Sequence, residues 1–373
     1  MSALRNTLDK MKPTFSKGGK LSALGSFFDA METFFFVPKT VTRRGTHIKD
    51  SVDLKRTMIT VMIALIPVFL FSIYNIGYQM NLAYGYGWGF WMIVWRGFLK
   101  ILPLYLVSYI VGLFFECMFA QIKGEEVNEG YFVTGFLIPL IMPVNIPLWM
   151  LAIAVAFAVV IGKEVFGGTG MNIWNPALLC RAFLFFSYPK MMSGDSVWVA
   201  HKIGVDAVSC ATPLSEMASG GMSAMSYSPL QMFIGLIPGS VGETSTLCIL
   251  RGALVLLFTG VGSWKVMLSC VAGGLLAGLL GNVPAYYHLI MGGFAFGCVF
   301  MATDPVTSAQ TETGKWIYGF LIGAFAVLLR IFNPGYPEGM MLSILLMNTF
   351  APLIDHMVVN GNIRRRLRRA KTV

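Results

Sequence analysis

The sequence predicts an all-α polytopic membrane protein with about ten transmembrane helices. Its mean hydropathy is +0.69, with 56% hydrophobic and only 12% charged residues. An ordinary soluble domain has about 25% charged residues, so this composition excludes one. Eleven Lys and Arg lie in residues 1–56 and six more in 364–371, which makes seventeen of twenty-eight. Basic ends beside spans stay in the cytoplasm, so we expect both termini inside and an even number of spans.

Ten apolar runs approach the roughly 20 residues that a helix needs to cross a bilayer. The third and the fifth are the shortest of them. The predicted spans are residues 57–76, 98–120, 130–143, 147–162, 175–188, 244–262, 265–281, 286–302, 315–332 and 339–359.

These runs divide the chain into two transmembrane halves around one long polar loop. A cytoplasmic N-terminus places this loop in the periplasm. The expected divisions are a basic cytoplasmic segment 1–56, a first transmembrane half 57–188, a periplasmic loop 189–243, a second half 244–359 and a basic cytoplasmic tail 360–373.

A faint internal repeat relates the two halves. Residues 135–143 precede a span that ends at Lys163-Glu164, and residues 297–305 precede one that ends at Arg330. Five spans in each half would give the halves opposite orientations, as in two inverted five-helix repeats. In such folds broken helices leave backbone groups free to hold a ligand near the midplane, and Pro139–Pro147 and Thr303–Pro305 are the matching segments. The alternative is that these prolines only end helices.

The basic run Arg364–Arg369 and the six cysteines limit the other classes. The run follows the last span directly, which favours a topology anchor at the lipid surface over nucleic-acid binding. The cysteines show no metal-ligand spacing, and five of them lie in apolar runs. We therefore expect no metal or iron–sulfur cluster within this chain.

The loop 189–243 contains the sequence Asp206-Ala-Val-Ser209-Cys210-Ala211-Thr212. Small neighbours leave the Thr212 hydroxyl accessible to a modifying enzyme, with a carboxylate nearby. The pattern is similar to D-x-x-S/T-G-A-T, the sequence to which a flavin transferase joins FMN through its phosphate. Cys210 stands where that pattern usually has Gly, and Cys cannot adopt a positive φ freely.

Much of residues 40–370 resembles the B subunit of the Na⁺-translocating NADH:quinone oxidoreductases. The matching segments are Arg44–Arg56, Asn128–Gly130, Gly167–Gly170, Asn175–Leu178, Arg181–Phe186, Gly239–Thr246, Ala302–Pro305, Asn333-Pro334, Pro337–Met341 and Ala351–His356. The resemblance implies covalent FMN on Thr212, a noncovalent riboflavin among the helices, a quinone site and part of a sodium path in a bacterial inner membrane. NADH, FAD and the iron–sulfur centres would belong to the other subunits (A, C, D, E and F).

Charged residues in or beside spans are costly and need a reason. Asp355, Asp304 and Glu129 are the candidates for the sodium path, because a carboxylate is a natural ligand for a hard cation. Asn128, Glu129 and Gly130 are the candidates for the quinone site, where Gly130 leaves room beside the backbone. The alternative is that such charges only reach the membrane interface or neutralise an opposite charge, which we favour for both Glu116 and Arg251.

Two other functions remain open from the sequence. The D subunit of an Rnf-type ferredoxin:NAD⁺ oxidoreductase would share the flavin pattern and the span plan. The basic extension before residue 57 favours the quinone reductase. A cofactor-free channel of the urea-transporter type could have the same hydropathy, because a fold does not fix a function. Bound flavin would exclude the channel.

Overall fold

The structure is a computed structural model that describes residues 2–15, 53–123, 130–195, 197–200, 210–333 and 338–371, with residues 25, 28, 32, 36, 42 and 44–48. Every regular element in these residues is a helix. They are α1 (Ser2–Phe15), α3 (Leu54–Tyr84), α4 (Phe90–Lys123), α5 (Gly130–Ile141), α6 (Leu148–Val160), η2 (Glu164–Phe166), α7 (Pro176–Ser187), α8 (Pro189–Met192), α9 (Pro213–Gly220), η3 (Gly221–Ala224), α10 (Pro229–Ile234), α11 (Thr246–Phe258), α12 (Trp264–Gly278), α13 (Tyr287–Ile290), α14 (Phe294–Phe296), η4 (Gly297–Met301), α15 (Glu312–Phe332) and α16 (Gly339–Lys371).

By length and composition, five helical segments in the described part of the chain can cross a membrane. They are Leu54–Tyr84, Phe90–Lys123, Leu148–Phe166, Glu312–Phe332 and Gly339–Ala370. Four further apolar helices, α5, α7, α11 and α12, have 12 to 15 residues. At 1.5 Å per residue they reach about 18–23 Å, less than the ~30 Å hydrocarbon core. The all-helical membrane fold is thus confirmed, while these four helices are shorter than full spans.

Two helices differ from the predicted spans, and the predicted polar loop has short helices of its own. The first span continues to Tyr84, well beyond residue 76. The predicted span 286–302 is broken into α13, α14 and η4, because Gly292 adopts a φ of 61° that interrupts the helix. The polar loop 189–243 contains α8, α9, η3 and α10. Periodicity over a long window does not register such short helices.

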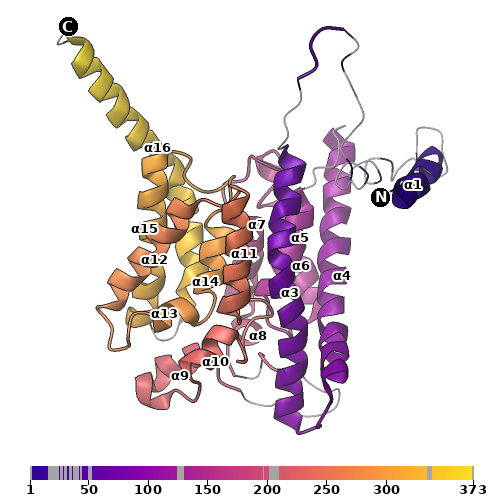
Figure 1. Ribbon diagram of the computed structural model, residues 1–373, viewed down its shortest axis with the longest axis vertical. Helices are drawn as coiled ribbons and strands as arrows, with labels where there is room; N and C mark the ends of the chain where they lie inside the picture. The colour runs from indigo at the N-terminus through magenta and orange to yellow at the C-terminus, as the bar shows by residue number, and fades with distance from the viewer. Residues whose placement is uncertain are drawn as a thin grey trace.

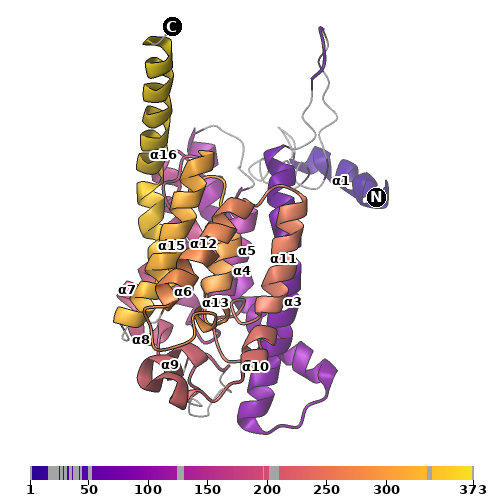
Figure 2. The same cartoon turned by 60° about the vertical axis from the view of Figure 1, so that its left-hand side comes forward.

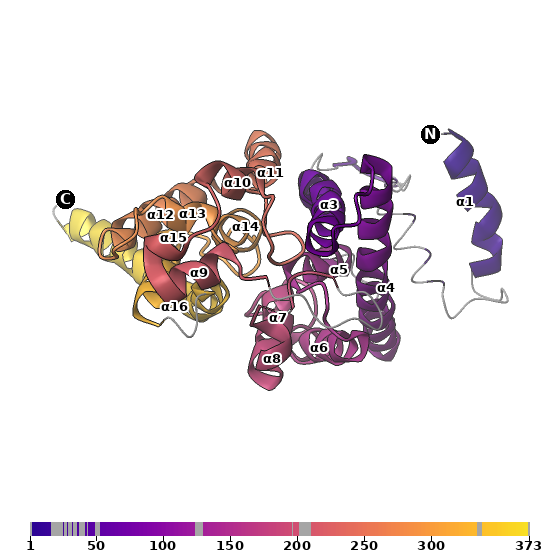
Figure 3. The same ribbon diagram turned by 90° about the horizontal axis from the view of Figure 1, so that it is seen from below.

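The helices form two groups that are seen end-on in Figure 3. In the first group α4 packs on α3, α5 and α6, and in the second α15 packs on α12 and α16. Glycines let the backbones approach: a Cβ atom at Gly97 would overlap the Ile73 carbonyl oxygen, and one at Gly323 would overlap that of Cys270. Small residues at such contacts are typical of membrane helices. The two groups are joined where α11 packs on α3.

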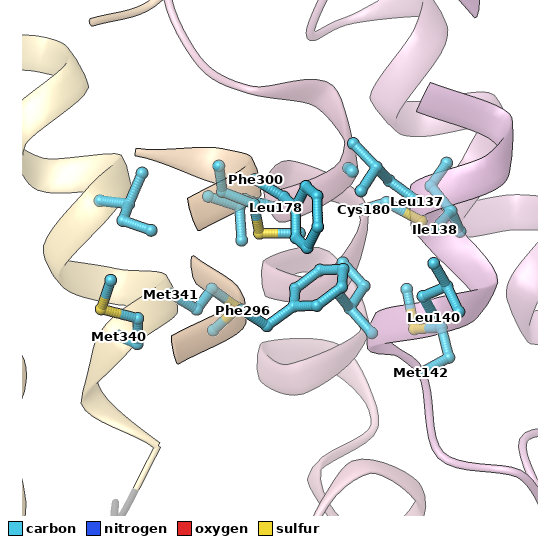
Figure 4. Packing of buried hydrophobic residues seen from close by; sticks show 14 of the residues in the cluster. Leu137, Ile138, Leu140, Met142, Leu178, Cys180, Phe296, Phe300, Met340 and Met341 are labelled. Atoms are coloured by element: carbon cyan, nitrogen blue, oxygen red, sulfur yellow. The ribbon is translucent and has the colours of Figure 1, made fainter. Parts of the chain in front are cut away.

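A shared hydrophobic core fills the space between the groups. Figure 4 shows Phe296 and Phe300 between α7 and α16, with the side chains of α5 beyond. The two rings lie 5.1 Å apart between centroids. This packing places the broken segment α14–η4 at the centre of the molecule.

The molecule has two distinct ends. The helix α1 and the C-terminal turns of α16 lie at one end, and α16 extends beyond the body there (Figure 1). The short helices α8, α9 and α10 lie at the opposite end (Figure 2). Two polar cavities in the described part of the chain lie toward opposite ends of the molecule.

Candidate functional site

The first cavity lies at the end that carries α8–α10, and we call it the Thr212 cavity. It is a partly open hollow, in which about 350 Å³ is not filled by protein atoms, part of this space being open to the surroundings. Its lining is Trp198, Thr212, Pro213, Leu214, Ile237, Pro238, Gly239, Ser240, Glu243, Thr244, Gly292 and Glu338. Three parts of the chain therefore meet around Thr212: the polar loop, the segment before α11 and the break before α14.

Thr212 begins α9. Its Oγ1 accepts a hydrogen bond from the Ser215 backbone N–H at 3.1 Å, and Pro213 occupies the first helical position. Thr212 is half-buried, because Leu214 and Met217 on α9 pack into a small cluster with Met232, Ile237, Tyr287 and Met291. The sequence predicted a more open loop, since it did not reveal this cluster. An anion attached at Thr212 would lie at a helix N-terminus, where free N–H groups and the helix dipole favour negative charge.

The residues just before Thr212 are only partly within the described structure. Asp206 and Ser209 lie outside the described residues. Cys210 and Ala211 are half-buried, and the Cys210 N–H donates to the Asp195 carbonyl at 3.0 Å. No described residue other than glycine has a positive φ, so Cys210 has no need of the conformation that glycine would favour. Burial raises the pKa of the Cys210 thiol, and Asp195 adds to this effect.

A buried charge cluster forms the floor of the Thr212 cavity. Arg181 of α7 donates to Glu243 at 2.6 Å, to Ser240 Oγ at 3.3 Å and to Glu338. The Arg181 side chain is only 3% exposed. These residues come from both helix groups. The sequence did not predict that they pair with one another. An arginine in an apolar run signals that a carboxylate must lie nearby, but the sequence does not say which one.

The second cavity lies toward the end that carries the termini, and we call it the Asp304 cavity. It is also partly open, and about 770 Å³ in it is not filled by protein atoms, part of this space being open to the surroundings. Its polar lining includes Thr57, Thr134, Lys163, Thr169, Asn172, Asn175, Thr303 and Asp304. Its apolar lining includes Met58, Val61, Val133, Leu137, Pro176, Leu256, Val261, Phe300 and Val306.

Asp304 follows the broken segment and is held by uncharged groups. Its carboxylate accepts from Asn175 Nδ2 at 3.3 Å, Thr307 Oγ1 at 3.0 Å and the Val306 N–H at 3.2 Å. Asn175 also caps α7, where its Oδ1 accepts from the Ala177 N–H at 3.0 Å. The segment Thr303–Pro305, which the sequence singled out, thus faces a cavity. Pro139–Pro147 does not line it.

Lys163 is the one positively charged residue among the described residues that line the Asp304 cavity. It pairs with Glu116 of α4, and both side chains are buried. A second pair joins Lys123 to Glu164 at 2.8 Å. Glu116 therefore neutralises a lysine, as the sequence favoured, and the pair fixes the α6–α7 connection against α4.

Gly130 lines the Asp304 cavity, while Asn128 and Glu129 lie outside the described residues. A Cβ atom at Gly130 would come within 2.7 Å of Thr169 Cγ2. The space beside this glycine is therefore filled by Thr169. Thr169 sits in a turn made by Gly167, Gly168 and Gly170, all with φ near or above 90°. Glycine is needed there for backbone conformation.

Asp355 has a different position from Asp304. Its carboxylate accepts from the Gln310 N–H at 2.7 Å, the Thr311 N–H at 2.9 Å and Thr311 Oγ1 at 2.5 Å. Thr311 caps α15. Asp304 and Asp355 thus hold the two ends of one turn, and they make no direct contact with each other.

Apolar helices with two buried polar cavities beside a broken segment define a multi-pass helical membrane protein with internal polar sites. The chain belongs to the NQR2, RnfD, RnfE family, whose sequence model matches residues 41–364. Among its relatives, the B subunit of the Na(+)-translocating NADH-quinone reductase of Chromohalobacter salexigens is 48% identical over 400 residues, covering 98% of this chain and 96% of that protein. Proteins of the same name from Ectopseudomonas mendocina and Pseudomonas aeruginosa are 49% and 46% identical, each covering 98% of this chain and 99% of the relative.

Proposed function

We propose that this chain is the B subunit of a Na⁺-translocating NADH:quinone reductase, a translocase. It would carry electrons through covalent FMN and riboflavin to quinone, coupled to Na⁺ export. Near-complete coverage by relatives of that name supports this over the D subunit of an Rnf-type enzyme, although the family includes both. The observation that carries the proposal is Thr212, placed at a helix N-terminus and on a polar cavity.

FMN fits the surroundings of Thr212. A phosphodiester on its Oγ1 would carry negative charge beside the Ser215 N–H, at the start of the 8-residue helix α9. Glycines at 239 and 292 open the cavity wall toward the charge cluster. Asp206, Ser209, Cys210 and Ala211 would form the recognition sequence of the flavin transferase. Bound FMN would supply transfer of one or two electrons, while the chain holds its phosphate and screens it from water.

Riboflavin fits the Asp304 cavity, which is larger and offers both hydrogen-bonding and apolar walls. The Thr169 hydroxyl is buried and has no hydrogen-bond partner among the residues that the structure describes. A buried unpaired hydroxyl is costly, so a polar ligand there would stabilise the cavity. Asn175 and Lys163 provide further donors from the same wall.

The two cavities lie close enough to pass electrons. Pro176 lines the Asp304 cavity, while Arg181, five positions later on α7, donates to Ser240, Glu243 and Glu338, which line the Thr212 cavity. The whole of α7 has 12 residues, which is about 18 Å at 1.5 Å per residue. That is shorter than the ~30 Å thickness of the hydrocarbon core. Short helices therefore support the role of riboflavin as an intermediate carrier.

We also propose the inverted-repeat plan of ten membrane segments. Its support is that the fourth helix of each half leads to a buried cation, Lys163 after α6 and Arg330 within α15. Lys163 lines the Asp304 cavity at one end, and Arg330 lies near the Thr212 cavity at the other. In this plan both basic ends, 1–56 and 360–373, are cytoplasmic, 57–188 and 244–359 are the two halves, and 189–243 is periplasmic in a bacterial inner membrane.

The remaining sites are assigned around the Asp304 cavity. Asn128, Glu129 and Gly130 would form the quinone site beside the cavity assigned to riboflavin. Gly130 is part of the lining of that cavity, but Thr169 fills the space directly next to Gly130. Glu129, Asp304 and Asp355 would serve the sodium path. Partners would be the other subunits (A, C, D, E and F), which hold the NADH, FAD and iron–sulfur sites, and membrane lipid around the helices.

Mass spectrometry of the peptide that contains Thr212 tests the proposal. Protein made together with a flavin transferase should show one added FMN, and Thr212→Ala should show none. Thr212→Ser is the matched control, because it keeps the hydroxyl. An unmodified wild-type peptide, with the transferase shown to be active on another substrate, would refute the flavin role. Total absence of flavin would instead support the channel hypothesis.

A further inference from the structure

Arg330 is a buried cation that the proposed electron path does not use. It lies near the end of α15 and is 4% exposed. Its Nη1 donates to the His288 carbonyl at 2.5 Å and its Nη2 to the Met291 carbonyl at 3.1 Å. Its Nε has no hydrogen-bond partner in the structure. Such a guanidinium costs free energy unless it meets negative charge.

The two nearby carboxylates are already engaged. Glu243 and Glu338 interact electrostatically with Arg330, but both form their hydrogen bonds with Arg181. Phe294 lies 5.8 Å from the guanidinium carbon, measured to the ring centroid. The two backbone carbonyls and this ring hold the Arg330 guanidinium in one orientation. Among the described residues, no carboxylate forms a hydrogen bond with it.

Gly292 places this cation against the wall of the Thr212 cavity. A Cβ atom at position 292 would come within 3.3 Å of Arg330 Nη2 and 3.1 Å of Leu214 Cδ2. Both Gly292 and Leu214 line the cavity. Because Gly292 has no side chain, the Arg330 guanidinium can lie close to the cavity wall. A side chain at position 292 would stand between the guanidinium and the cavity.

We propose that Arg330 is a positioning residue that stabilises the negative charge of a reduced flavin ring attached at Thr212. The inference rests on the proposed function. A flavin ring that had taken up two electrons from a reduced carrier of the complex and one proton from water would carry one negative charge, and Arg330 would supply the opposing positive charge. The phosphate already meets the N-terminus of α9, so the ring is the part that can extend toward Gly292. A fixed positive charge in a poorly solvated site favours the reduced form.

The expected effect of Arg330→Gln is an at least tenfold weaker preference for the reduced flavin. For a two-electron couple this is a fall of about 30 mV in midpoint potential. Arg330→Lys keeps the charge and should restore most of the potential. Glu338→Gln removes a neighbouring negative charge and should move the potential upward. Arg251→Gln, an exposed arginine on α11, is the matched control and should change nothing.

The test is a redox titration of the covalent flavin in the purified complex, at fixed pH and sodium concentration. Flavin fluorescence on a denaturing gel first shows that FMN is attached. An attached flavin with unchanged potential in Arg330→Gln overturns the inference and leaves the proposed function standing. Absence of attached flavin in the wild type refutes the proposed function instead. If Arg330→Gln does not assemble, Glu338→Gln decides, and an unchanged potential there also overturns the inference.

Discussion

The two cavities share a plan but differ in how charge is arranged around them. In the Thr212 cavity one arginine bridges two carboxylates, and a second arginine lies behind a glycine. In the Asp304 cavity the lysine is matched by one carboxylate, and Asp304 is held by neutral donors. The first arrangement suits a ligand whose charge changes, and the second suits a neutral one. Two cavities in one helical fold can thus be specialised by a few buried charges.

Removing the central cation should have the largest effect. Arg181→Gln leaves the buried Glu243 and the half-buried Glu338 without their shared donor. Breaking a buried ion pair from one side costs about 3–5 kcal/mol, so we expect a large fall in thermal stability in detergent. The matched control is Arg251→Gln. A fall no larger than in that control would show that the cluster is not the structural base of the Thr212 cavity.

The next largest effect is expected on noncovalent flavin in the Asp304 cavity, and not on covalent flavin in the Thr212 cavity. Thr169→Val removes a buried hydroxyl that has no partner in the structure and keeps the shape of the side chain. If a polar ligand fills the Asp304 cavity, noncovalent flavin should bind several-fold to tenfold more weakly, corresponding to about 1 kcal/mol. Covalent flavin at Thr212 should remain unchanged. Unaltered retention of noncovalent flavin together with a more stable protein would mean that this hydroxyl meets no ligand.

A smaller effect is expected at the 310–311 turn, which precedes α15 and is held by Asp355. Asp355→Asn keeps the size of the side chain but weakens its hydrogen bonds to the 310–311 turn. Hydrogen bonds to a charged group contribute about 1.5–3 kcal/mol, of which the amide should retain part. The measurements are thermal stability and the sodium concentration for half-maximal quinone reduction. A shift in sodium dependence without loss of stability would indicate a direct place on the ion path. Loss of stability alone would indicate a capping role.

The smallest effect is expected beside Thr212. Cys210→Gly restores the residue usual in the flavin pattern, but no described non-glycine residue here requires a positive φ. The extent of FMN attachment, measured by gel fluorescence, should therefore stay the same. A clear gain over the wild type would show that the transferase bends the chain at this position, and Cys210→Ala is the control for losing the thiol.

Sequence reasoning found the class of fold because hydropathy is a property of each segment by itself. It located α3, α4, α15 and α16, yet it took 286–302 for one span. The break at Gly292 is decided by its place between Leu214 and Arg330, which no local pattern records. It also singled out Thr212 and Asp304 but did not place them on cavities.

By itself, the sequence determined a helical membrane protein with basic ends, membership of the family and the flavin pattern that ends at Thr212. Only the tertiary structure decided which charges meet. Arg181 forms ion pairs with Glu243, 62 positions away in the sequence, and with Glu338, 157 positions away. Asn175 forms a hydrogen bond with Asp304, 129 positions away. The physical reason is that a buried charge requires a partner but does not specify one. The partner is selected by how closely the glycine-lined helices and the broken segment pack.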